Sequence, residues 1–538
     1  MVSGWPSPLF YIILTVYLLA GVLFATLTPN WQAPDEPAHY NYVRYLAAQS
    51  GFPELTSRCY DQAYLEQLKS RYFPPELPLD TVCYEFHQPP LYYLLATPIF
   101  ILSDGSLLAL RLLSMALGGG VVALAFVIGR TIFPEWAIIA YGTMAFVAFG
   151  PMHVAMLASV NNDALAELIL AALLLLLTRR LLDSGQSTTW NDVTLGILLG
   201  LGLITKTTVY ITIPLIAVAL WLASGEAKRR GSSRGAGEQG SRGAEHPQMR
   251  SVSHWSRLRL SRVEWPLLAK QILLIYGLAL AIALPWYGRN ATLYGNFDLL
   301  GLARHNVVVV GQLRTADFLA EVGWRTYLNN FITTTFHSFW GQFGWMAVPM
   351  SERVYLALTL LMLTALGGIV GYVMWDMGYE KDVSKFHVLG TYQALRTTQG
   401  QALALMALTV GLMGLGYIWY NLEFVQFQGR YLFPALIPLG LFFSLGLQEA
   451  LSPRWAWWLA GGLALALGWL MVASLLSGDL DKWAVLITGL PLALAAARAW
   501  LVPRWLVPAA WLMAACYAGL ALLTLVSPFW YVVPYLSR

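Results

Sequence analysis

Charged residues are scarce in this chain. Asp, Glu, Lys and Arg account for 12% of its 538 residues, where about a quarter is usual in soluble domains, and 57% of the residues are hydrophobic. The mean hydropathy is +0.57. This shortage of charge excludes an ordinary soluble domain. We expect an all-α polytopic membrane protein, because lipid-exposed backbone must satisfy its own hydrogen bonds.

Several familiar motifs are also missing. The chain contains no Cys and His at metal-binding spacing, no serine nucleophile elbow and no glycine-rich nucleotide fingerprint. The glycine run LGGGVV at residues 117–122 lies inside an apolar stretch, so it indicates close helix packing and not a phosphate loop. These absences disfavour an enzyme that uses ATP or a nucleotide sugar on the cytoplasmic side.

Cysteines number three, and the net charge is only +4. Cys59 and Cys83 share one long polar segment, whereas Cys516 lies in an apolar run. The sequence permits a disulfide between Cys59 and Cys83 in an oxidising exterior and equally permits two free thiols, because it does not show whether the sulfur atoms meet. The small positive charge favours contact with anionic membrane lipids over binding of nucleic acid.

Thirteen apolar runs are long enough to cross a hydrocarbon core of about 30 Å. They lie at residues 9–28, 107–130, 135–151, 162–178, 192–208, 209–224, 266–287, 352–375, 401–420, 431–449, 455–476, 482–500 and 505–528. The first run has no small-residue cleavage site after it, so we interpret it as a retained span and not as a signal peptide. The shorter stretch 89–103 begins with two prolines and is predicted to form an interfacial or re-entrant helix.

Arginine and lysine set the predicted orientation. With thirteen spans and the N-terminus inside, most basic connections fall on the cytoplasmic side, whereas a fourteenth span at 89–103 would put most of them outside. The polar segments then become a first outer loop at 29–106 with juxtamembrane helices, a disordered basic cytoplasmic linker at 225–262 and a second outer loop at 288–351. Residues 1–538 are expected to form one membrane domain.

Acidic residues lie at the outer ends of two predicted spans, after the run 9–28 and at the start of the run 162–178. Asp35 and Glu36 stand in WQAPDEPAHY, and His39 comes one helical turn after Asp35, so the two share a face if Pro34 starts a helix. Asp163 follows two asparagines where the chain re-enters the membrane. The alternative for each acid is a helix N-cap with a solvated carboxylate.

Basic residues are predicted on the same outer face. Arg430 follows a glycine at the start of a span, where a planar guanidinium is well suited to phosphate. Lys206 lies at the outer end of a span and Arg289 at the start of the second outer loop. The alternatives are lipid headgroup contact for Arg430, snorkelling for Lys206 and a structural hydrogen bond for His87 in EFHQPPLYYLL.

The order of short motifs resembles a known family. After the acidic pair come HQPPLYYLL, Asp163, TKTT at 205–208, PWYGRNATLYGN at 285–296 and QGRYLFP at 428–434. This series resembles the GT-C superfamily of integral membrane glycosyltransferases, most closely the DUF2142 family of predicted membrane proteins. It resembles the protein O-mannosyltransferases and the lipid A aminoarabinose transferases more distantly.

The resemblance implies a GT-C-like fold of about 13 spans and a function in the cytoplasmic (plasma) membrane. A sugar would move from a polyprenyl-phosphate donor to a glycan, lipid or protein acceptor on the outer face, with inversion. Asp35 would act as the base and Arg430, Lys206 and Arg289 would bind the donor phosphate. Glu36 and Asp163 would orient the acceptor or hold the basic groups, or a divalent metal ion would bind Asp35 and Asp163. His39 and His87 would be accessory.

Two other functions fit many spans with outer charges. A lipid-linked glycan transporter or flippase would place ionisable groups near the middle of the membrane, whereas the charges here are predicted at the outer ends of spans. A glycan polymerase or ligase would use a lipid-diphosphate donor and would favour more arginines in the outer loops.

Overall fold

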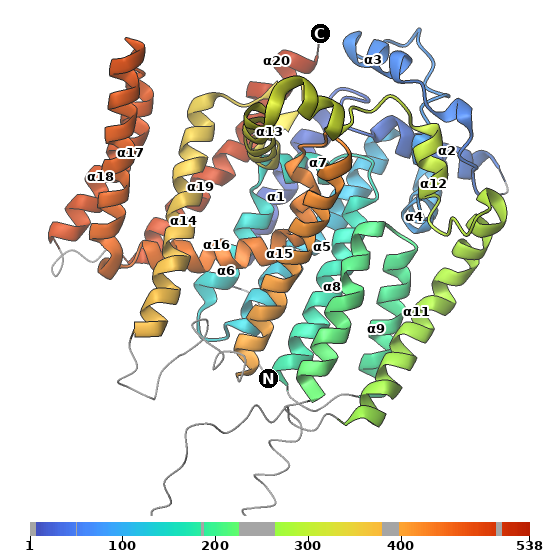
Figure 1. The fold of residues 1–538 in the computed structure, drawn as a ribbon, viewed down its shortest axis with the longest axis horizontal. Helices are drawn as coiled ribbons and strands as arrows, with labels where there is room; N and C mark the ends of the chain where they lie inside the picture. The colour runs from blue at the N-terminus through green and yellow to red at the C-terminus, as the bar shows by residue number, and fades with distance from the viewer. Residues whose placement is uncertain are drawn as a thin grey trace, which may run out of the picture.

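A computed structural model describes residues 7–49, 51–183, 188–224, 264–378, 397–501 and 508–537. Nearly all of the described chain is helical, and the only strands in these ranges are the short β1 (Gln342–Phe343) and β2 (Val348–Pro349), which pair antiparallel. Figure 1 shows long helices side by side, with a layer of short helices and loops over one end. The predicted linker 225–262 lies outside the described residues.

The long helices form the body of the protein. They are α1 (Pro8–Leu27), α5 (Leu107–Ile132), α8 (Asp163–Leu182), α9 (Thr189–Leu203), a helix at Thr207–Ser224 that opens with η3 (Thr207–Ile211), α11 (Trp265–Tyr294), α14 (Glu352–Gly378), α15 (Thr398–Glu423), α16 (Leu436–Ala450), α17 (Ala456–Ser477), α18 (Lys482–Leu501) and α19 (Ala509–Ser527). Between α5 and α8 the chain forms a broken pair, α6 (Ala137–Ala148) and α7 (Pro151–Leu157), which bends by 64°.

Every one of the thirteen predicted spans overlaps a helix or this broken pair. Ten helices in the described ranges meet a length and hydropathy requirement for crossing a membrane, and the broken pair gives up to eleven. The helices α8 and α9 account for the difference. α8 contains Glu167, Arg179 and Arg180 besides its first residue, Asp163, and α9 has only 15 residues. The protein is an integral membrane protein, with fewer clear spans than the predicted thirteen.

Glycine allows α5 to pack closely against its neighbours, as the run at 117–122 predicts. A Cβ at Gly118 would collide with the hydroxyl of Tyr17 on α1, and one at Gly120 would lie 2.7 Å from Leu168 Cδ1 on α8. α5 accordingly contacts α1, α6 and α8 along its length. These contacts bring α1, α5 and α8 together beneath the polar residues described below.

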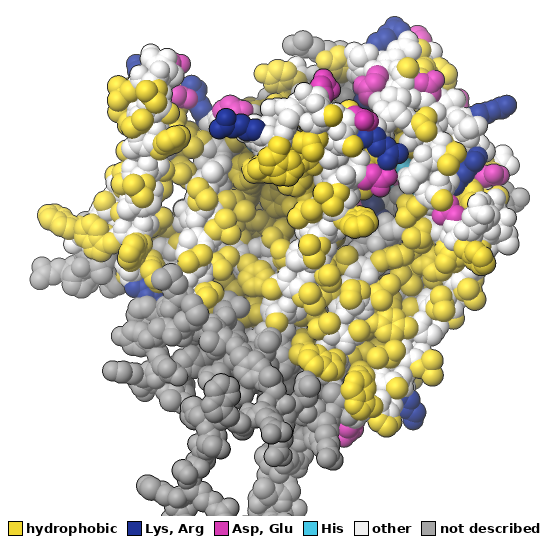
Figure 2. All heavy atoms as spheres, viewed as in Figure 1, with side chains coloured by type: hydrophobic (Ala, Val, Ile, Leu, Met, Phe, Trp, Pro, Cys, Tyr) yellow, Lys and Arg dark blue, Asp and Glu magenta, His cyan; other side chains and the backbone are white. Residues whose placement is uncertain are grey.

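One end of the helix bundle carries a polar layer, which we call the loop face. It contains α2 (Glu36–Ala48), α3 (Gln62–Ser70), α12 (Leu302–Val308), α13 (Thr315–Trp340) and α20 (Val533–Leu536), at the top of Figure 1. The short apolar helix α4 (Leu91–Leu102) leads from this layer into the bundle and is too short to span, as predicted. In Figure 2 the charged side chains gather at the loop face, above a broad hydrophobic band.

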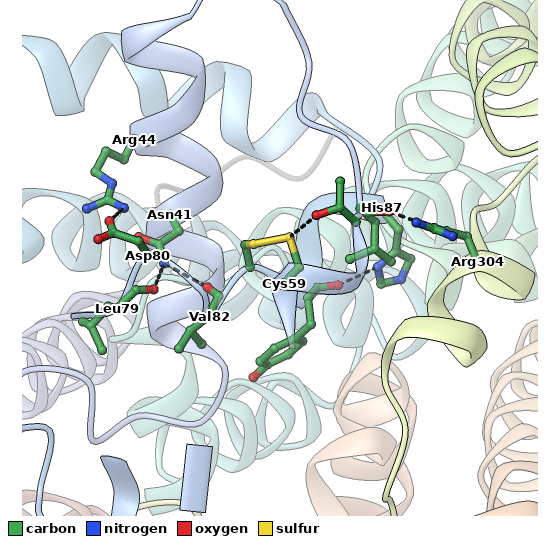
Figure 3. Close-up of a disulfide and its surroundings, with 12 residues drawn as sticks. Asn41, Arg44, Cys59, Leu79, Asp80, Val82, His87 and Arg304 are labelled. Atoms are coloured by element: carbon green, nitrogen blue, oxygen red, sulfur yellow. Dashed lines mark hydrogen bonds and ion pairs between the residues drawn. A yellow bond between two sulfur atoms is a disulfide. The ribbon is translucent and has the colours of Figure 1, made fainter. Parts of the chain in front are cut away.

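A disulfide fixes the middle of the first loop. Cys59 and Cys83 are bonded, with their Cα atoms 4.5 Å apart. Nearby, the Asn41 amide donates to the carbonyl oxygens of Leu79 (2.7 Å) and Val82 (2.8 Å), which attaches the segment before Cys83 to α2 (Figure 3). The alternative that the sequence left open, two free thiols, is therefore not what the structure shows.

The first loop also rests on the second. Arg304 of α12 donates from Nε to the carbonyl oxygen of Leu55 at 2.9 Å, and the Tyr294 hydroxyl accepts from the Leu55 N–H at 3.1 Å. A tight fit at Gly301, where a Cβ would lie 3.1 Å from the Cβ of His87, joins α12 to the end of the first loop. These contacts hold the two loops together as one layer around the residues of the site.

Candidate functional site

Asp35 lies at the start of α2 but does not cap it. The helix begins at Glu36, two residues later than the predicted start at Pro34, and Asp35 has a left-handed backbone with φ of 66°. This conformation costs a non-glycine residue about 1 kcal/mol. The carboxylate instead accepts from Arg430 Nη2 at 2.8 Å and from the Tyr84 hydroxyl at 2.7 Å. The N-cap alternative for Asp35 is therefore wrong.

Arg430 contacts Asp35 although the two residues are 395 positions apart in the sequence. It is the second residue of the 3-10 helix η5 (Gly429–Ala435), just before α16. A Cβ at Gly429 would collide with the Thr335 carbonyl oxygen of α13, so only glycine fits beside the arginine. Arg430 Nε donates to Gln428 Oε1 at 2.6 Å, and its guanidinium lies 5.5 Å from the centre of the Tyr431 ring. The guanidinium is thus oriented from three sides.

A second ion pair combines two other predicted residues. Asp163 is the first residue of α8, and its carboxylate lies 2.6 Å from Lys206 Nζ, just before η3. The Asp163 N–H donates to Asn161 Oδ1 at 2.9 Å, so the asparagine caps the turn. The side chains are 26% and 18% exposed, compared with 24% for Asp35 and 10% for Arg430. Both pairs are therefore partly accessible.

His39 lies among the same charged groups. Its Nδ1 is 2.8 Å from the Tyr93 hydroxyl of α4. Burial lowers the pKa of His39, although Glu85, Asp35 and Asp163 oppose the shift; Lys206 adds to it. The imidazole is therefore neutral near pH 7. Charged groups of both ion pairs and Glu85 act on His39, and Asp163 also acts on Arg430, so these groups lie around one part of the loop face.

Asp35 remains ionised in this setting. Burial favours the neutral acid, but the Arg430 guanidinium and the Tyr84 hydroxyl outweigh it and hold the pKa of Asp35 below its ordinary value. Burial and the nearby carboxylates raise the pKa of Tyr84 well above its usual range, so the phenol keeps its proton and donates to Asp35. Asp35 is consequently a charged hydrogen-bond acceptor at neutral pH.

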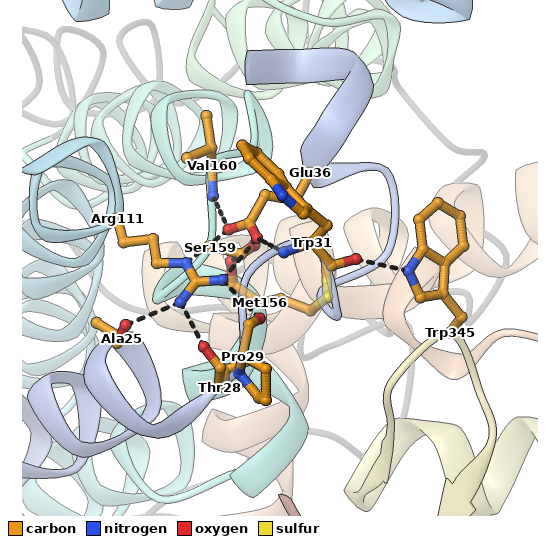
Figure 4. A network of polar contacts seen from close by, with 10 residues as sticks. All are labelled: Ala25, Thr28, Pro29, Trp31, Glu36, Arg111, Met156, Ser159, Val160 and Trp345. Atoms are coloured by element: carbon orange, nitrogen blue, oxygen red, sulfur yellow. Dashed lines mark hydrogen bonds and ion pairs between the residues drawn. The ribbon is translucent and has the colours of Figure 1, made fainter. Parts of the chain in front are cut away.

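Glu36 has a different partner from its neighbour. Arg111 of α5 donates to both carboxylate oxygens, from Nε to Oε1 at 2.8 Å and from Nη2 to Oε2 at 2.6 Å. Figure 4 shows how the remaining bonds close the pair: Arg111 also donates to the carbonyl oxygens of Ala25, Thr28 and Pro29, and Glu36 accepts the N–H groups of Trp31 and Val160. The side chains are 3% and 0% exposed. Glu36 is thus enclosed and does not face the accessible site.

Two further predicted residues serve the loops in this structure. Arg289 donates from Nη2 to the carbonyl oxygens of Phe52 and Pro53, at 3.2 and 2.6 Å, and its guanidinium lies over the Trp286 ring. His87 Nδ1 lies 3.0 Å from the Tyr84 carbonyl oxygen, and its ring is 4.6 Å from that of His305. Burial, with His305 nearby, lowers the pKa of His87 to about 3. The structural alternative for His87 fits this environment.

Some important residues were not among the predicted site residues. Tyr84 and Gln428 orient Asp35 and Arg430, and Arg111 binds Glu36. Arg111 had a usable signal, because a charged residue inside an apolar run requires a partner. Gln428 stood in the QGRYLFP motif but was not assigned a role, and Tyr84 had no signal, since tyrosine is ordinary in polar loops.

The residues do not form a recognisable metal site. No group of three or more His, Cys, Asp or Glu side chains suitable for a metal ion occurs in the described ranges. Asp35 and Asp163, the two predicted ligands, are each bonded to a cationic side chain instead. We therefore derive no reaction step through a metal. A cavity of about 270 Å³ lies elsewhere, between the end of α5 and Leu182 at the end of α8, and contains none of the predicted site residues.

Comparison with solved structures defines the fold. ArnT from Cupriavidus metallidurans in the apo state has a TM-score of 0.50 at 14% identity, over 96% of this chain and 76% of that one. ArnT bound to undecaprenyl phosphate gives 0.49 at 14% identity, over 98% and 78%. The archaeal oligosaccharyltransferase AglB from Archaeoglobus fulgidus, in complex with an inhibitory peptide and a dolichol-phosphate, gives 0.39 at 13%, over 95% and 56%. The likeness to apo ArnT shows a GT-C-like membrane fold.

The family follows from the sequence match. Residues 81–439, more than half of the chain, match the family model described as "Predicted membrane protein (DUF2142)", and the protein belongs to this family. Both parts of the predicted resemblance, the DUF2142 family and the GT-C fold, are confirmed. No curated protein sequence matches the chain significantly.

Proposed function

We propose that this protein is a membrane glycosyltransferase that moves a sugar from a polyprenyl-phosphate donor to an acceptor outside the membrane. The observation that carries the proposal is the meeting of two partly exposed acid–cation pairs, Asp35 with Arg430 and Asp163 with Lys206, at the loop face of a GT-C-like fold. A polyprenyl chain lies in the membrane, so its phosphate group would arrive from the apolar bundle and needs cations where the bundle meets the loop face. An acceptor hydroxyl arrives from water and gains from a carboxylate.

Arg430 and Lys206 would bind the donor phosphate. A guanidinium has five N–H donors, and Arg430 uses one Nη2 hydrogen for Asp35 and its Nε hydrogen for Gln428. The Nη1 group contacts the Met156 sulfur at 3.9 Å, a weak acceptor that phosphate can replace. Lys206 has three donors and the ion pair with Asp163 occupies one. Both cations can therefore hold phosphate without leaving their acids.

Asp35 would accept the proton of the acceptor hydroxyl. In a single displacement, the acceptor oxygen bonds to the anomeric carbon and the bond from that carbon to the phosphate oxygen breaks, with inversion. The bonding electrons leave with the polyprenyl phosphate, whose new charge Arg430 stabilises, and the hydroxyl proton passes to Asp35. A carboxylate of lowered pKa is a weak base but is ionised in every molecule at neutral pH.

Two observations support an outward loop face in the plasma membrane. The Cys59–Cys83 disulfide belongs to the loop face, and disulfides persist in oxidising compartments. Arg130 lies in the last turn of α5, and Arg179 and Arg180 lie in the last turn of α8, at the ends away from the loop face. Positive residues prefer the cytoplasmic side. Together these favour chemistry on the outer side.

Mass spectrometry of lipids that copurify with the protein tests the proposal. The wild type should carry a polyprenyl monophosphate, in part glycosylated, and Arg430→Ala should lose both forms. Arg353→Ala is the matched control, because Arg353 pairs with Asp481 in an exposed position and should keep the lipid. Only bulk phospholipid in the wild type would overturn the proposal. A lipid-diphosphate oligosaccharide that Arg430→Ala retains would favour the transporter or the polymerase instead.

A further inference from the structure

Glu85 is another carboxylate of the site, and none of the described residues forms an ion pair with it. It lies in the 3-10 helix η2 (Tyr84–His87), next to the tyrosine that bonds to Asp35. Within the described part of the chain, its Oε2 is buried and receives no hydrogen bond. Asp35 and Asp163, by contrast, are each held by a basic side chain. An unpaired carboxylate oxygen is costly to bury, so a donor from outside the protein is expected there.

A second acceptor without a donor belongs to Asn162, whose side chain contacts Gln88 of the same loop as Glu85. Asn162 is fully buried, and its Oδ1 likewise receives no hydrogen bond from the described residues. Its Nδ2 faces two acceptors at 3.4 Å, Gln88 Oε1 and the Thr205 carbonyl oxygen, so the amide orientation is fixed and its oxygen is left over. Gln88 in turn donates its N–H to the Glu85 carbonyl oxygen at 2.9 Å. The two unsatisfied acceptors thus belong to one connected set of residues.

The chemistry that satisfies both acceptors is a group with several O–H donors. Phosphate has only oxygen acceptors at neutral pH and would be repelled by Glu85. A cation could bind Glu85 without displacing an existing partner, but neither the lipid donor nor a neutral acceptor carries a cation. A sugar offers several hydroxyl donors on one ring. The Glu85 side chain is partly exposed, so a ligand at the loop face can reach its carboxylate group.

We propose that Glu85, with Asn162, binds hydroxyl groups of the sugar carried by the donor lipid and so selects the glycosylated lipid over the bare one. This inference rests on the proposed function. It divides the site into cations that hold the phosphate, Asp35 that receives the acceptor proton, and acceptors that hold the sugar. Glu85 contacts substrate in this scheme but takes no proton from it.

Copurified lipids distinguish this inference from the proposed function. In Glu85→Gln the total polyprenyl phosphate should stay at the wild-type amount, while the ratio of glycosylated to bare lipid should fall about tenfold, the size expected for losing a charged hydrogen bond. Glu76→Gln is the matched control, an exposed glutamate of the same loop, and should leave the ratio unchanged. Because Glu85 makes no ion pair in the described structure, the substitution should not impair folding, which thermal unfolding in the same detergent checks.

The other outcomes are each decisive. If Arg430→Ala loses both lipid forms but Glu85→Gln keeps the wild-type ratio, the proposed function stands and the inference about Glu85 is wrong. If Glu85→Gln instead accumulates the glycosylated lipid, Glu85 takes part in turnover and is the base, which also overturns the inference. If the wild type carries no polyprenyl phosphate, both proposals fall together.

Discussion

Asp35 and Glu36 are neighbours in the chain with opposite environments. Glu36 is fully buried and bound by Arg111 on both oxygens, and backbone groups satisfy what remains. Asp35 is 24% exposed, is bound to Arg430 by a single guanidinium nitrogen, and retains acceptor capacity. Consecutive residues at a helix start point in different directions, so one carboxylate turns into the bundle and the other into the site. A closed ion pair fixes structure, whereas an open one can exchange partners with a substrate.

The largest expected effect comes from breaking the closed pair. Glu36→Ala leaves Arg111 charged and buried, which should lower the free energy of unfolding by about 3–5 kcal/mol. Equilibrium unfolding in detergent, followed by tryptophan fluorescence, measures this. Asp80→Ala, which removes an exposed partner of Arg44, should change stability by less than about 1 kcal/mol. A similar loss for both variants would contradict the distinction between closed and open pairs.

Removing both members of the closed pair should restore part of this stability. In the double variant Glu36→Met with Arg111→Met no charge is left buried, so we expect recovery of about 1–3 kcal/mol relative to Glu36→Ala. Recovery stays incomplete because the carbonyl oxygens of Ala25, Thr28 and Pro29 lose their donor. The same unfolding experiment measures the recovery. A double variant less stable than Glu36→Ala would show that the arginine stabilises the fold without its carboxylate.

His87 should make the protein less stable in acid, and this effect involves neither the Glu36–Arg111 pair nor the Asp35–Arg430 pair. Its pKa of about 3 in the folded protein lies below the unfolded value near 6.5, so the unfolded chain binds the extra proton between these values. Stability should therefore fall as pH decreases from about 6.5 towards 3, by about 1.4 kcal/mol per pH unit. His87→Asn, which can still donate to the Tyr84 carbonyl oxygen, should flatten the profile in this window. An unchanged slope would assign the loss to other groups.

The smallest effect on stability is expected at the open pair. The lowered pKa of Asp35 means that its ion pair stabilises the protein above the unfolded pKa near 3.9 and is lost as pH falls through the folded value. Asp35→Asn should cost only about 1 kcal/mol at pH 7, because the pair is partly exposed. The difference from wild type should disappear in strong acid. A cost as large as that of Glu36→Ala would make Asp35 a structural residue.

Much of this arrangement could be predicted from the sequence. Apolar runs located every long helix of the bundle but not α13, whose 26 residues lie in the predicted second outer loop. The outer ends of those runs placed Asp35, Asp163, Lys206 and Arg430 on one face. Glu36 was grouped with Asp35 because the two are adjacent, although adjacent helical residues do not face the same way. Arg289 lies within α11 and not in a loop, and its contacts with the first loop depend on how the end of this helix meets that loop, which no local pattern encodes. The roles of these residues in catalysis stay predictions.

The most direct test of the central claim is the affinity of the purified protein for undecaprenyl phosphate. Titration in detergent should show that Arg430→Ala binds at least tenfold more weakly than wild type, because it loses a charged phosphate contact, while Arg353→Ala binds normally. Arg430→Lys should fall between them, since it keeps the charge and loses the planar fork. Equal affinity for wild type and Arg430→Ala would contradict the proposal that the open pair receives a lipid phosphate.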